Sequence, residues 1–191
     1  MSIYELIRNT RSTRSFDESV PIPREVLYRC ADAARLTASS RNDQVLKFRL
    51  VSDRAEVEAV LSHTKWAGYL PELKLPPEGR HPTGFIVICH DREIAANAEP
   101  YARDVGIAAE AIVLTASEAG FASCMIGAFS ASGVAEALGL SDTLAPRLVI
   151  ALGKGDETIV LTEPRDGDVK YYRDADGTHY VPKRKAEEVI I

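Results

Sequence analysis

The stretch Asp104–Phe129, DVGIAAEAIVLTASEAGFASCMIGAF, says most about how this chain folds. Its first part, Asp104–Ala119, predicts a helix in which Glu110 is the only charged residue outside the two end turns, so the helix is apolar almost all round. Gly120 is expected to end this helix. Burial on every side requires a large domain or a partner subunit, and a chain of 191 residues favours the partner.

Segments with helical or strand periodicity lie on both sides of this stretch. Ser2–Arg8 is predicted to form a helix that begins with a capping box between Ser2 and Glu5. Residues 64–83 contain four prolines and are expected to form a long loop, of the kind that often serves as a lid. Helices outnumber strands and come between them, which is typical of an α+β or α/β protein. The remaining helices are predicted at 24–36, 54–61 and 132–138, and the strands at 47–51, 85–89 and 148–153.

The bulk composition excludes several classes of function. The chain is 46% hydrophobic and 27% charged, as in ordinary globular proteins. Its net charge of −5 and pI of about 5.4 argue against a broad nucleic-acid-binding surface. No window approaches the roughly 18 apolar residues of a membrane span, and residues 1–10 lack the apolar core of a signal peptide. We therefore expect no nucleic-acid or membrane partner.

Cysteine and histidine usage points to a reduced compartment without a structural metal. The three cysteines, Cys30, Cys89 and Cys124, are scattered and odd in number, which favours free thiols in a cytoplasmic protein. The four histidines show no metal-ligand spacing, so no metal is assigned. Cys124 is interpreted as a small buried hydrophobe rather than a nucleophile, because no histidine or second cysteine lies near it in the sequence.

Two polar clusters near the start of the chain suggest a phosphorylated cofactor. Arg11-Ser12-Thr13-Arg14 joins two cations and two hydroxyls on one short stretch, which suits a doubly charged phosphate. Ser39–Gln44, SSRNDQ, is an amide-rich loop that can donate hydrogen bonds to a flat heterocycle and accept them from it. A phosphate-binding cluster followed by a heterocycle-binding cluster is the pattern expected of a nucleotide-like cofactor.

With these clusters in place, the chain resembles the nitroreductase family of FMN-dependent oxidoreductases. Five segments carry the resemblance, in the family's order and over nearly the whole length. They are Arg11–Phe16 (the family's Arg-x-Ser-x-Arg/Lys-x-Phe), Leu36–Gln44 (Ala-Pro-Ser-x-x-Asn-x-Gln), Asp104–Ala109 (the start of its long interface helix), Gly120–Phe129 (Gly-x-x-Ser-Cys-Trp-Ile-Gly) and the ending His179–Arg184.

The resemblance implies a nitroreductase-like α+β fold, in which a mixed sheet is flanked by helices. It implies that residues 1–191 form a single FMN-binding domain and that two copies form an intertwined homodimer with the flavin sites at the interface. The C-terminal segment would wrap over the partner and could add an edge strand to its sheet. In that arrangement one chain holds half of each site.

The resemblance also implies roles for particular residues. Arg11 and Ser12 would contact the FMN phosphate and ribityl end, and Arg14 would approach the N1/O2 edge of the flavin. Ser39, Asn42 and Gln44 would line the isoalloxazine or ribityl chain. Lys183 and Arg184 would be C-terminal phosphate contacts. Trp66, Tyr69 and Phe129 could frame the space over the flavin or belong to the core.

Ile126-Gly127 is the predicted reaction centre. Hydride enters and leaves at flavin N5, and a backbone N–H directed at N5 would orient the ring and tune its potential. Glycine at this point lets the backbone approach closely. The implied activity is transfer of hydride from NADH or NADPH to FMN, followed by ping-pong reduction of a small acceptor such as a nitroaromatic or quinone.

Other interpretations remain open at the level of sequence. Arg11 and Arg14 could be solvated loop charges, the polar residues of the 39–44 loop could be ordinary turn residues, and Gly127 could serve only a turn. The same cofactor could support dehalogenation or alkene reduction, and a non-catalytic protein could use the basic cluster to bind a phosphorylated ligand. The chain departs from the family at Ala38, Val45-Leu46 and Met125, where Pro, Pro-Trp and Trp are usual, which affects the pocket shape more than the cofactor.

Overall fold

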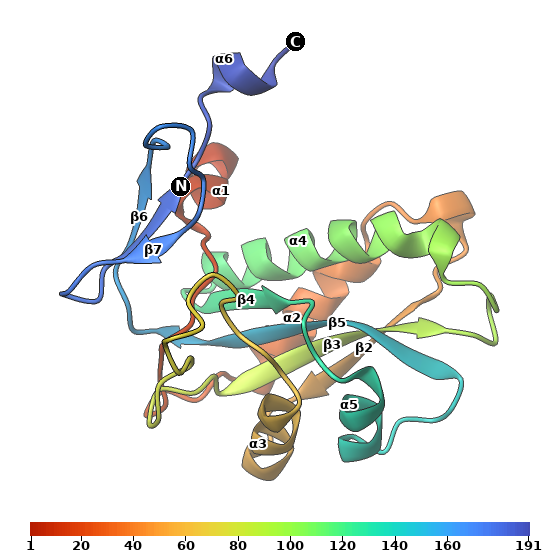
Figure 1. Cartoon of the computed structure of the whole chain (residues 1–191). Coiled ribbons are helices and arrows are strands. Elements are labelled where there is room, and N and C mark those ends of the chain that lie inside the picture. Colours follow the sequence, from red (N-terminus) through yellow and green to blue (C-terminus); the bar gives the residue numbers. More distant parts are fainter.

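The longest strand, β5 (Leu144–Gly155), is the centre of a five-stranded sheet in the computed structural model, which describes residues 1–191 (Figure 1). One edge of β5 pairs with β3 (Gly84–Asp91), which pairs in turn with β2 (Leu46–Val51). The opposite edge pairs with β4 (Ala122–Ile126), and the end of β5 pairs with the short β1 (Phe16–Asp17). All of these pairings are antiparallel.

Helices cover both faces of this sheet. α2 (Arg24–Arg35) and α4 (Ala102–Glu118) pack on one face, and α3 (Arg54–Ser62) and α5 (Ala131–Ala137) pack on the other (Figure 1). Every residue of β3 is buried, because a central strand with helices on both faces has no solvated side. The predicted helices and strands are therefore present, and the α+β class with a helix-flanked sheet is confirmed.

The two faces of β3 belong to two separate hydrophobic clusters. Phe85 and Val87 point toward α3 and α5, where they pack with Val57 and Val134. Ile86 and the other alternate residues point toward α2 and α4 and pack with their apolar faces. The continuous apolar run seen in the sequence is thus two alternating faces, as the period of two along a strand requires.

The ends of the helices follow from local sequence. α1 (Ile3–Asn9) begins with the predicted capping box, in which Ser2 and Glu5 bond reciprocally. α3 is capped by Asp53, whose carboxylate accepts from two backbone N–H groups of the first turn. α4 is followed by Gly120 at φ 81°, a left-handed conformation that favours glycine and ends the helix.

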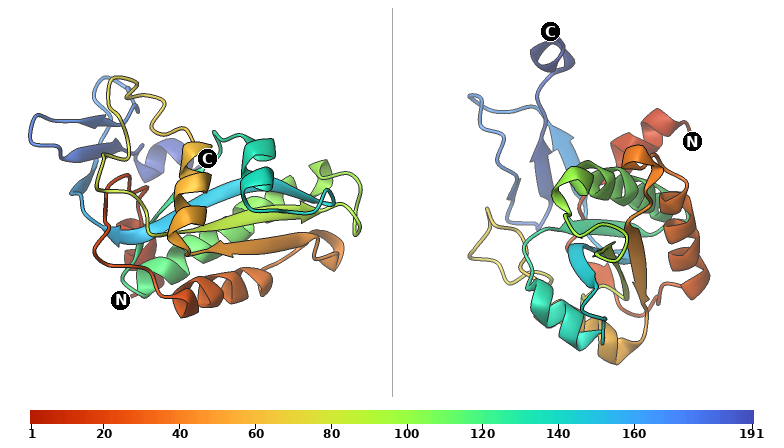
Figure 2. Two further views of the ribbon diagram at one scale, coloured as in Figure 1. Left: turned by 90° about the horizontal axis from the view of Figure 1, so that it is seen from below. Right: turned by 90° about the vertical axis from the view of Figure 1, so that its right-hand side faces the viewer.

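The C-terminal part of the chain forms a second, smaller sheet. β6 (Ile159–Thr162) pairs in parallel with β8 (His179–Pro182), and β7 (Tyr172–Arg173) pairs with β8 on its other edge. These strands pair with one another within the chain, and β6 and β7 are the edge strands of this small sheet. The addition of an edge strand to a partner's sheet stays a prediction. After β8 the chain leads away from the body to the short α6 (Ala186–Val189) and the C-terminus (Figure 2).

One face of α4 is not covered by the chain itself. The buried residues of α4 face the sheet and α2, whereas Ile107 is 43% exposed and Glu110 is exposed on the outer side. On α1, which lies near α4, Ile3 and Tyr4 are about three-quarters exposed. A single chain therefore buries α4 on one side only, and the all-round burial expected from its sequence would require another surface. α4 is the longest helix, and none of the helices combines the length and the hydropathy of a membrane span.

Candidate functional site

The first polar cluster is attached to the sheet through β4. Ser12 forms an isolated parallel bridge with Ser123, and the Thr13 backbone N–H donates to the Ser123 carbonyl at 2.9 Å. Thr13 is buried, while Arg11 and Arg14 both line one cavity beside it. The segment is therefore an ordered addition to the sheet and not a solvated loop.

Four of the predicted cofactor ligands meet around one cavity of about 370 Å³, which we call the arginine cavity. These four are Arg11, Ser12, Arg14 and Lys183, and they come from the start and the end of the chain. Arg184 does not line it and is exposed. The full lining is Thr10, Arg11, Ser12, Arg14, Glu110, Val113, Ser123, Met125, Tyr171, His179, Val181 and Lys183.

Arg11 keeps hydrogen-bonding capacity that the protein does not use. Its Nη2 donates to the carbonyl of Ile7, the residue one helical turn earlier, but its Nε is buried without a partner. Burial lowers the pKa of Arg11, and the opposite charge of Glu110 partly offsets this effect. An unpaired guanidinium N–H beside a cavity is unfavourable in the free protein and would be satisfied by an anionic ligand.

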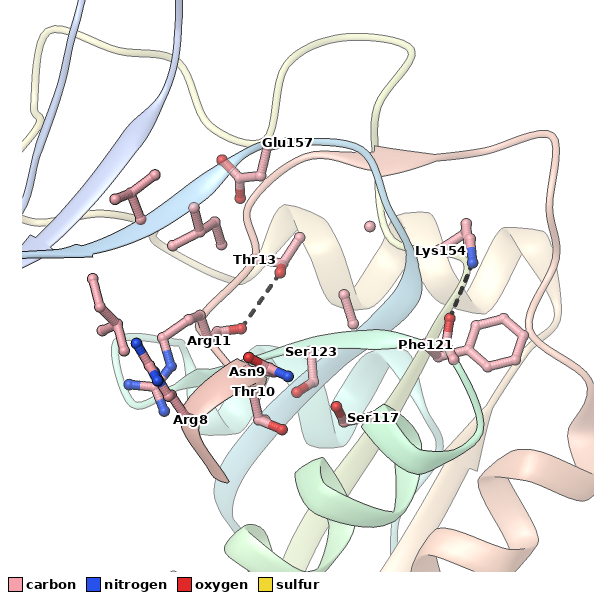
Figure 3. Close-up of a pocket in the computed structure, with 16 residues that line it drawn as sticks. Arg8, Asn9, Thr10, Arg11, Thr13, Ser117, Phe121, Ser123, Lys154 and Glu157 are labelled. Carbon is pink, nitrogen blue, oxygen red and sulfur yellow. Dashed lines mark hydrogen bonds between the residues drawn. The ribbon is translucent and has the colours of Figure 1, made fainter. Parts of the chain in front are cut away.

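A larger cavity of about 660 Å³ lies on the other side of Arg11 (Figure 3). Figure 3 shows the side chains of Arg8 and Arg11 gathered at one end of it and Lys154 at the other. Lys154 donates to the carbonyl of Gly120 at 3.3 Å, and Glu157 also lines the wall. Because Thr10, Arg11 and Ser123 line both cavities, the two spaces adjoin at Arg11.

Arg14 contacts Ser12 and three residues to which the sequence analysis gave no role. Its Nη1 lies 3.1 Å from His179 Nε2 and donates to the Ser12 carbonyl at 3.3 Å. Its guanidinium carbon lies 4.8 Å from the centre of the Tyr171 ring. The Arg14 backbone N–H donates to the buried carboxylate of Glu157.

The second polar cluster is anchored to the N-terminal end of α4. The carboxylate of Asp104, which is 3% exposed, accepts three hydrogen bonds from the loop. They come from Ser39 Oγ at 3.1 Å, Ser40 N at 2.8 Å and Ser40 Oγ at 2.6 Å. Their donation lowers the pKa of Asp104 even though burial acts in the opposite direction. These bonds explain why a charged residue starts an otherwise apolar helix.

The 39–44 loop has an unusual backbone. Arg41, Asn42 and Gln44 have φ values of 54°, 59° and 51°, all in the left-handed region that non-glycine residues seldom adopt. Each such residue costs of order 1–3 kcal/mol and persists only where the surrounding structure fixes it. Strain of this kind gathers at binding sites, so three left-handed residues in one short loop support a functional interpretation over ordinary turn chemistry.

Within one chain the two polar clusters do not meet. Ser39 contacts Asp104, whereas the arginine cavity borders α4 at Glu110 and Val113. Glu110 lies six positions from Asp104 and Val113 lies nine, which is about 9 Å and about 14 Å along a helix. Asn42 and Gln44 are exposed, and Ser39 and Gln44 line a different cavity of about 390 Å³. The structure thus places the predicted heterocycle-binding loop at the N-terminal end of α4 and the arginine cavity beside the middle of that helix.

Gly127 occupies an open position directly after β4. Ile126 is buried, but a Cβ built on Gly127 would meet no heavy atom within 4 Å, and its φ lies outside the left-handed region. Neither packing nor turn geometry therefore requires glycine here. Met125, two residues before it, is 37% exposed and lines the arginine cavity.

The aromatic residues divide between the core and the site. Trp66 and Phe129 pack against the hydrophobic cluster under α3 and α5. Tyr69 is 60% exposed, and its ring centre lies 5.2 Å from that of Tyr171, the residue that lies against the Arg14 guanidinium. Cys124 is buried and burial raises the pKa of its thiol to about 11, which agrees with its interpretation as a small hydrophobe.

The comparison with protein families supports the resemblance. The sequence model of the nitroreductase family matches residues 7–73 and 80–154. The matched region includes both polar clusters, α4 and all of β4, and it ends at Lys154, before the small C-terminal sheet.

Several solved structures share the fold. A protein from Desulfovibrio desulfuricans that is assigned as a nitroreductase, solved in complex with FMN, is 19% identical with a TM-score of 0.72, over 100% of this chain and 96% of that one. A nitroreductase family protein from Clostridium novyi is 23% identical with a TM-score of 0.66, over 100% of both chains. A Staphylococcus epidermidis protein assigned as an NAD(P)H:FMN oxidoreductase is 20% identical with a TM-score of 0.68, over 82% of this chain and 88% of that one.

Proposed function

Because the chain belongs to the nitroreductase family, we propose that it is an FMN-dependent oxidoreductase that uses NADH or NADPH to reduce a small acceptor such as a nitroaromatic or quinone. The observation that carries this proposal is the arginine cavity, where Arg11, Ser12, Arg14 and Lys183 converge from distant parts of the sequence. The solved complex of the Desulfovibrio protein with FMN adds support from the same fold.

The residues of the arginine cavity fit a flavin phosphate. Three of them are cations, Arg11, Arg14 and Lys183, and Glu110 is the only carboxylate in the lining. The unpartnered Nε of Arg11 offers a further donor. A cavity that is lined by two guanidinium groups and one ammonium group, against one carboxylate, suits a ligand that carries close to two negative charges.

We assign the residues as follows. Arg11, Ser12 and Lys183 hold the phosphate, and Arg14 faces the electron-rich edge of the ring system, where a fixed cation stabilises developing negative charge. The backbone at Ile126-Gly127 orients the reacting edge, and Arg184 is an outer phosphate contact. Bound FMN would supply the redox chemistry, taking hydride from NAD(P)H and then passing it to the acceptor in a ping-pong sequence.

We propose that a second copy of the chain completes the site. Ser39, Asn42 and Gln44 belong to the loop anchored at Asp104, about 9–14 Å along α4 from the residues that border the arginine cavity, so they would serve the cavity of a partner across a two-fold interface. The exposed apolar residues of α1 and the outer face of α4 supply surface for this homodimer. Residues 1–191 would then act as one FMN-binding unit, and the free, buried cysteines are in keeping with a cytoplasmic location.

A substitution at Gly127 tests the assignment of the reaction centre. Because a Cβ there meets nothing within 4 Å, Gly127→Val is expected to fold and to dimerise like the wild type. It should slow anaerobic reduction of the bound cofactor by NAD(P)H, since the side chain would intrude on the reacting edge. An unchanged reduction rate with bound FMN would exclude Gly127 from the site.

Parallel initial-velocity lines with NAD(P)H and a quinone would support the ping-pong sequence, and converging lines would oppose it.

A further inference from the structure

The small C-terminal sheet brings a histidine into contact with Arg14. His179 lies on β8, the central strand of that sheet, and pairs with Ile159 on one side and Arg173 on the other. Its backbone N–H donates to the Thr158 carbonyl at 2.9 Å, and the residue is 1% exposed. The ring lines the arginine cavity, with Nε2 3.1 Å from Arg14 Nη1.

The chemistry of this contact fixes the state of the imidazole. Arginine nitrogens can only donate, so His179 Nε2 must accept, and its proton must reside on Nδ1. Nδ1 is buried and has no protein partner. The charged groups around the ring are Arg14 and Arg173, and with burial as the larger cause they lower the pKa of His179 to about 4. The histidine is therefore neutral near pH 7.

A neutral acceptor leaves the charge of Arg14 available. A carboxylate bonded to the Arg14 side chain would compensate its positive charge, but the nearby Glu157 bonds to the Arg14 backbone N–H and to Arg173 instead. The Arg14 guanidinium is thus bonded to a neutral ring and to the Ser12 carbonyl. Tyr171 completes the contact, with its ring 4.8 Å from the guanidinium carbon and 5.4 Å from the His179 ring.

We propose that His179 is a positioning residue, which accepts a hydrogen bond from Arg14 and holds its guanidinium, to which no carboxylate is hydrogen-bonded, on the wall of the arginine cavity for an electron-rich ligand. The identification of that ligand as FMN rests on the proposed function. Ordering a long arginine side chain before the ligand arrives lowers the entropy cost of binding, and keeping its charge unpaired preserves its attraction for negative charge. Tyr171 contributes through its ring, which lies against the Arg14 guanidinium.

The contact can be tested without any cofactor. Long-range ¹H–¹⁵N NMR of the histidine-labelled apo protein near pH 7 is expected to show His179 as the Nδ1–H tautomer. Arg14→Met removes the donor and should abolish this preference. An Nε2–H tautomer in the wild type, or a tautomer that Arg14→Met leaves unchanged, would overturn the proposal.

The consequence for the ligand is tested with the holoprotein. His179→Phe keeps a ring against Tyr171 but removes the acceptor, and it should weaken FMN binding about tenfold and shift the midpoint potential of the bound cofactor. His179→Gln retains a neutral acceptor and should restore most of both. Tyr180→Phe, the next residue on β8, is the control, because Tyr180 bonds to Asp174 and does not line the cavity.

The outcomes separate this proposal from the proposed function. Equal FMN affinity and potential in wild type and folded His179→Phe would overturn the positioning role. A wild type that shows the Nδ1–H tautomer and yet binds no FMN would contradict the proposed function and would leave the pairing of His179 with Arg14 established. If His179→Phe does not fold, the comparison of the wild type with Arg14→Met by NMR still decides the first question.

Discussion

At the scale of single residues, the two arginines of the first cluster are held in different ways. Arg11 is tethered by one bond to the Ile7 carbonyl and retains a buried, unpartnered Nε, whereas Arg14 is enclosed by His179 and Tyr171. The register of the motif also separates them. When Ser12, Arg14 and Phe16 are aligned with the Arg-x-Ser-x-Arg/Lys-x-Phe pattern, its first arginine falls on Thr10, and Arg11 stands one residue later.

Removal of the Arg11 side chain tests its role at the phosphate. Arg11→Ala is expected to weaken FMN affinity by tenfold or more, because a charge-assisted hydrogen bond contributes roughly 1.5–3 kcal/mol. Quenching of FMN fluorescence on titration measures the affinity. Arg24→Ala, an exposed arginine at the start of α2, is the matched control and should bind FMN like the wild type. Equal affinities for both variants would remove Arg11 from the site.

The low pKa of His179 predicts how stability depends on pH. Its value falls from 6.5 to about 4 on folding, mainly through burial and then through Arg14 and Arg173. As the pH drops from about 6.5 toward 4, His179 takes up a proton in the unfolded chain but stays neutral in the folded protein. This difference lowers the free energy of unfolding over that pH range. Between about pH 7 and pH 5, the His179→Gln variant should therefore lose less of its free energy of unfolding than the wild type, as measured by urea unfolding at both pH values. An equal loss of unfolding free energy in the two proteins would contradict the lowered pKa of His179.

The residue scale also shows where prediction from sequence stopped. Arg11, Ser12, Arg14 and Lys183 were candidates because short motifs place them, and they line one cavity. His179 belonged to a motif but had no assigned role, and Tyr171 carried no signal at all. Their contacts with Arg14 depend on how residues 156–182 fold, and strands of two and four residues with long-range pairing leave little periodicity to detect.

At the scale of elements, α4 organises both halves of the proposed site. Asp104 in its first turn anchors the 39–44 loop, and Glu110 and Val113 further along it border the arginine cavity. The loop also depends on Tyr101, whose hydroxyl donates to the Asp43 carboxylate at 2.6 Å. The left-handed residues of the loop are therefore stabilised mainly by contacts to the segment that begins α4.

Loss of the Asp104 carboxylate should release this loop. Asp104→Ala leaves three donors of Ser39 and Ser40 without an acceptor, and we expect a loss of about 1–3 kcal/mol in the free energy of unfolding. FMN affinity should fall as well, because the strained conformation of Asn42 and Gln44 would no longer be fixed. Urea unfolding and FMN titration measure the two effects.

Asp53→Ala serves as the control for that experiment. It removes the N-cap of α3, which costs about 1 kcal/mol of stability, at a position remote from both polar clusters. This variant should lose stability and keep FMN affinity. A folded Asp104→Ala protein with wild-type affinity would show that the loop does not serve the cofactor.

The helices could be predicted more completely than the strands. The predicted helices agree with the observed ones to within about two residues, because capping residues and periodicity mark their ends. β5 extends over 144–155 where 148–153 was predicted, since Pro146 and Arg147 interrupt the apolar pattern at one end and Lys154 and Gly155 at the other. Pairing with β3 and β1 recruits these outer residues. β4 was not predicted as a strand, because ASCMI lacks a clear alternation and forms a strand through its pairing with β5.

At the scale of the whole molecule, a single chain keeps the two parts of the proposed site apart and leaves apolar surface uncovered. The two parts lie at different positions along α4, and Ile3, Tyr4 and Ile107 are exposed near its outer face. The C-terminal arm, residues 183–191, extends from the body and exposes Val189 and Ile190 (Figure 2). In the proposed homodimer, this arm and the outer face of α4 would dock on a second copy. That docking would cover the exposed apolar residues and bring the two parts of the proposed site together.

Truncation of the arm tests this arrangement. A deletion of residues 186–191 removes α6 and the exposed apolar end but keeps β8, His179 and Lys183, so the small sheet should remain folded. We expect the truncated protein to dissociate into monomers at higher protein concentrations than the wild type does. Sedimentation velocity over a concentration series measures this. A truncated protein whose dimer is as stable as the wild type would show that the arm does not bind the partner.

The most direct test of the central claim is a visible spectrum of the freshly purified protein, followed by anaerobic addition of NADH and, separately, NADPH. The proposed function predicts the absorbance of oxidised flavin and its bleaching by at least one of the two nucleotides, which would also identify the preferred donor. A protein that is colourless, and remains so after incubation with FMN and removal of the excess, would contradict the proposal that the arginine cavity binds a flavin.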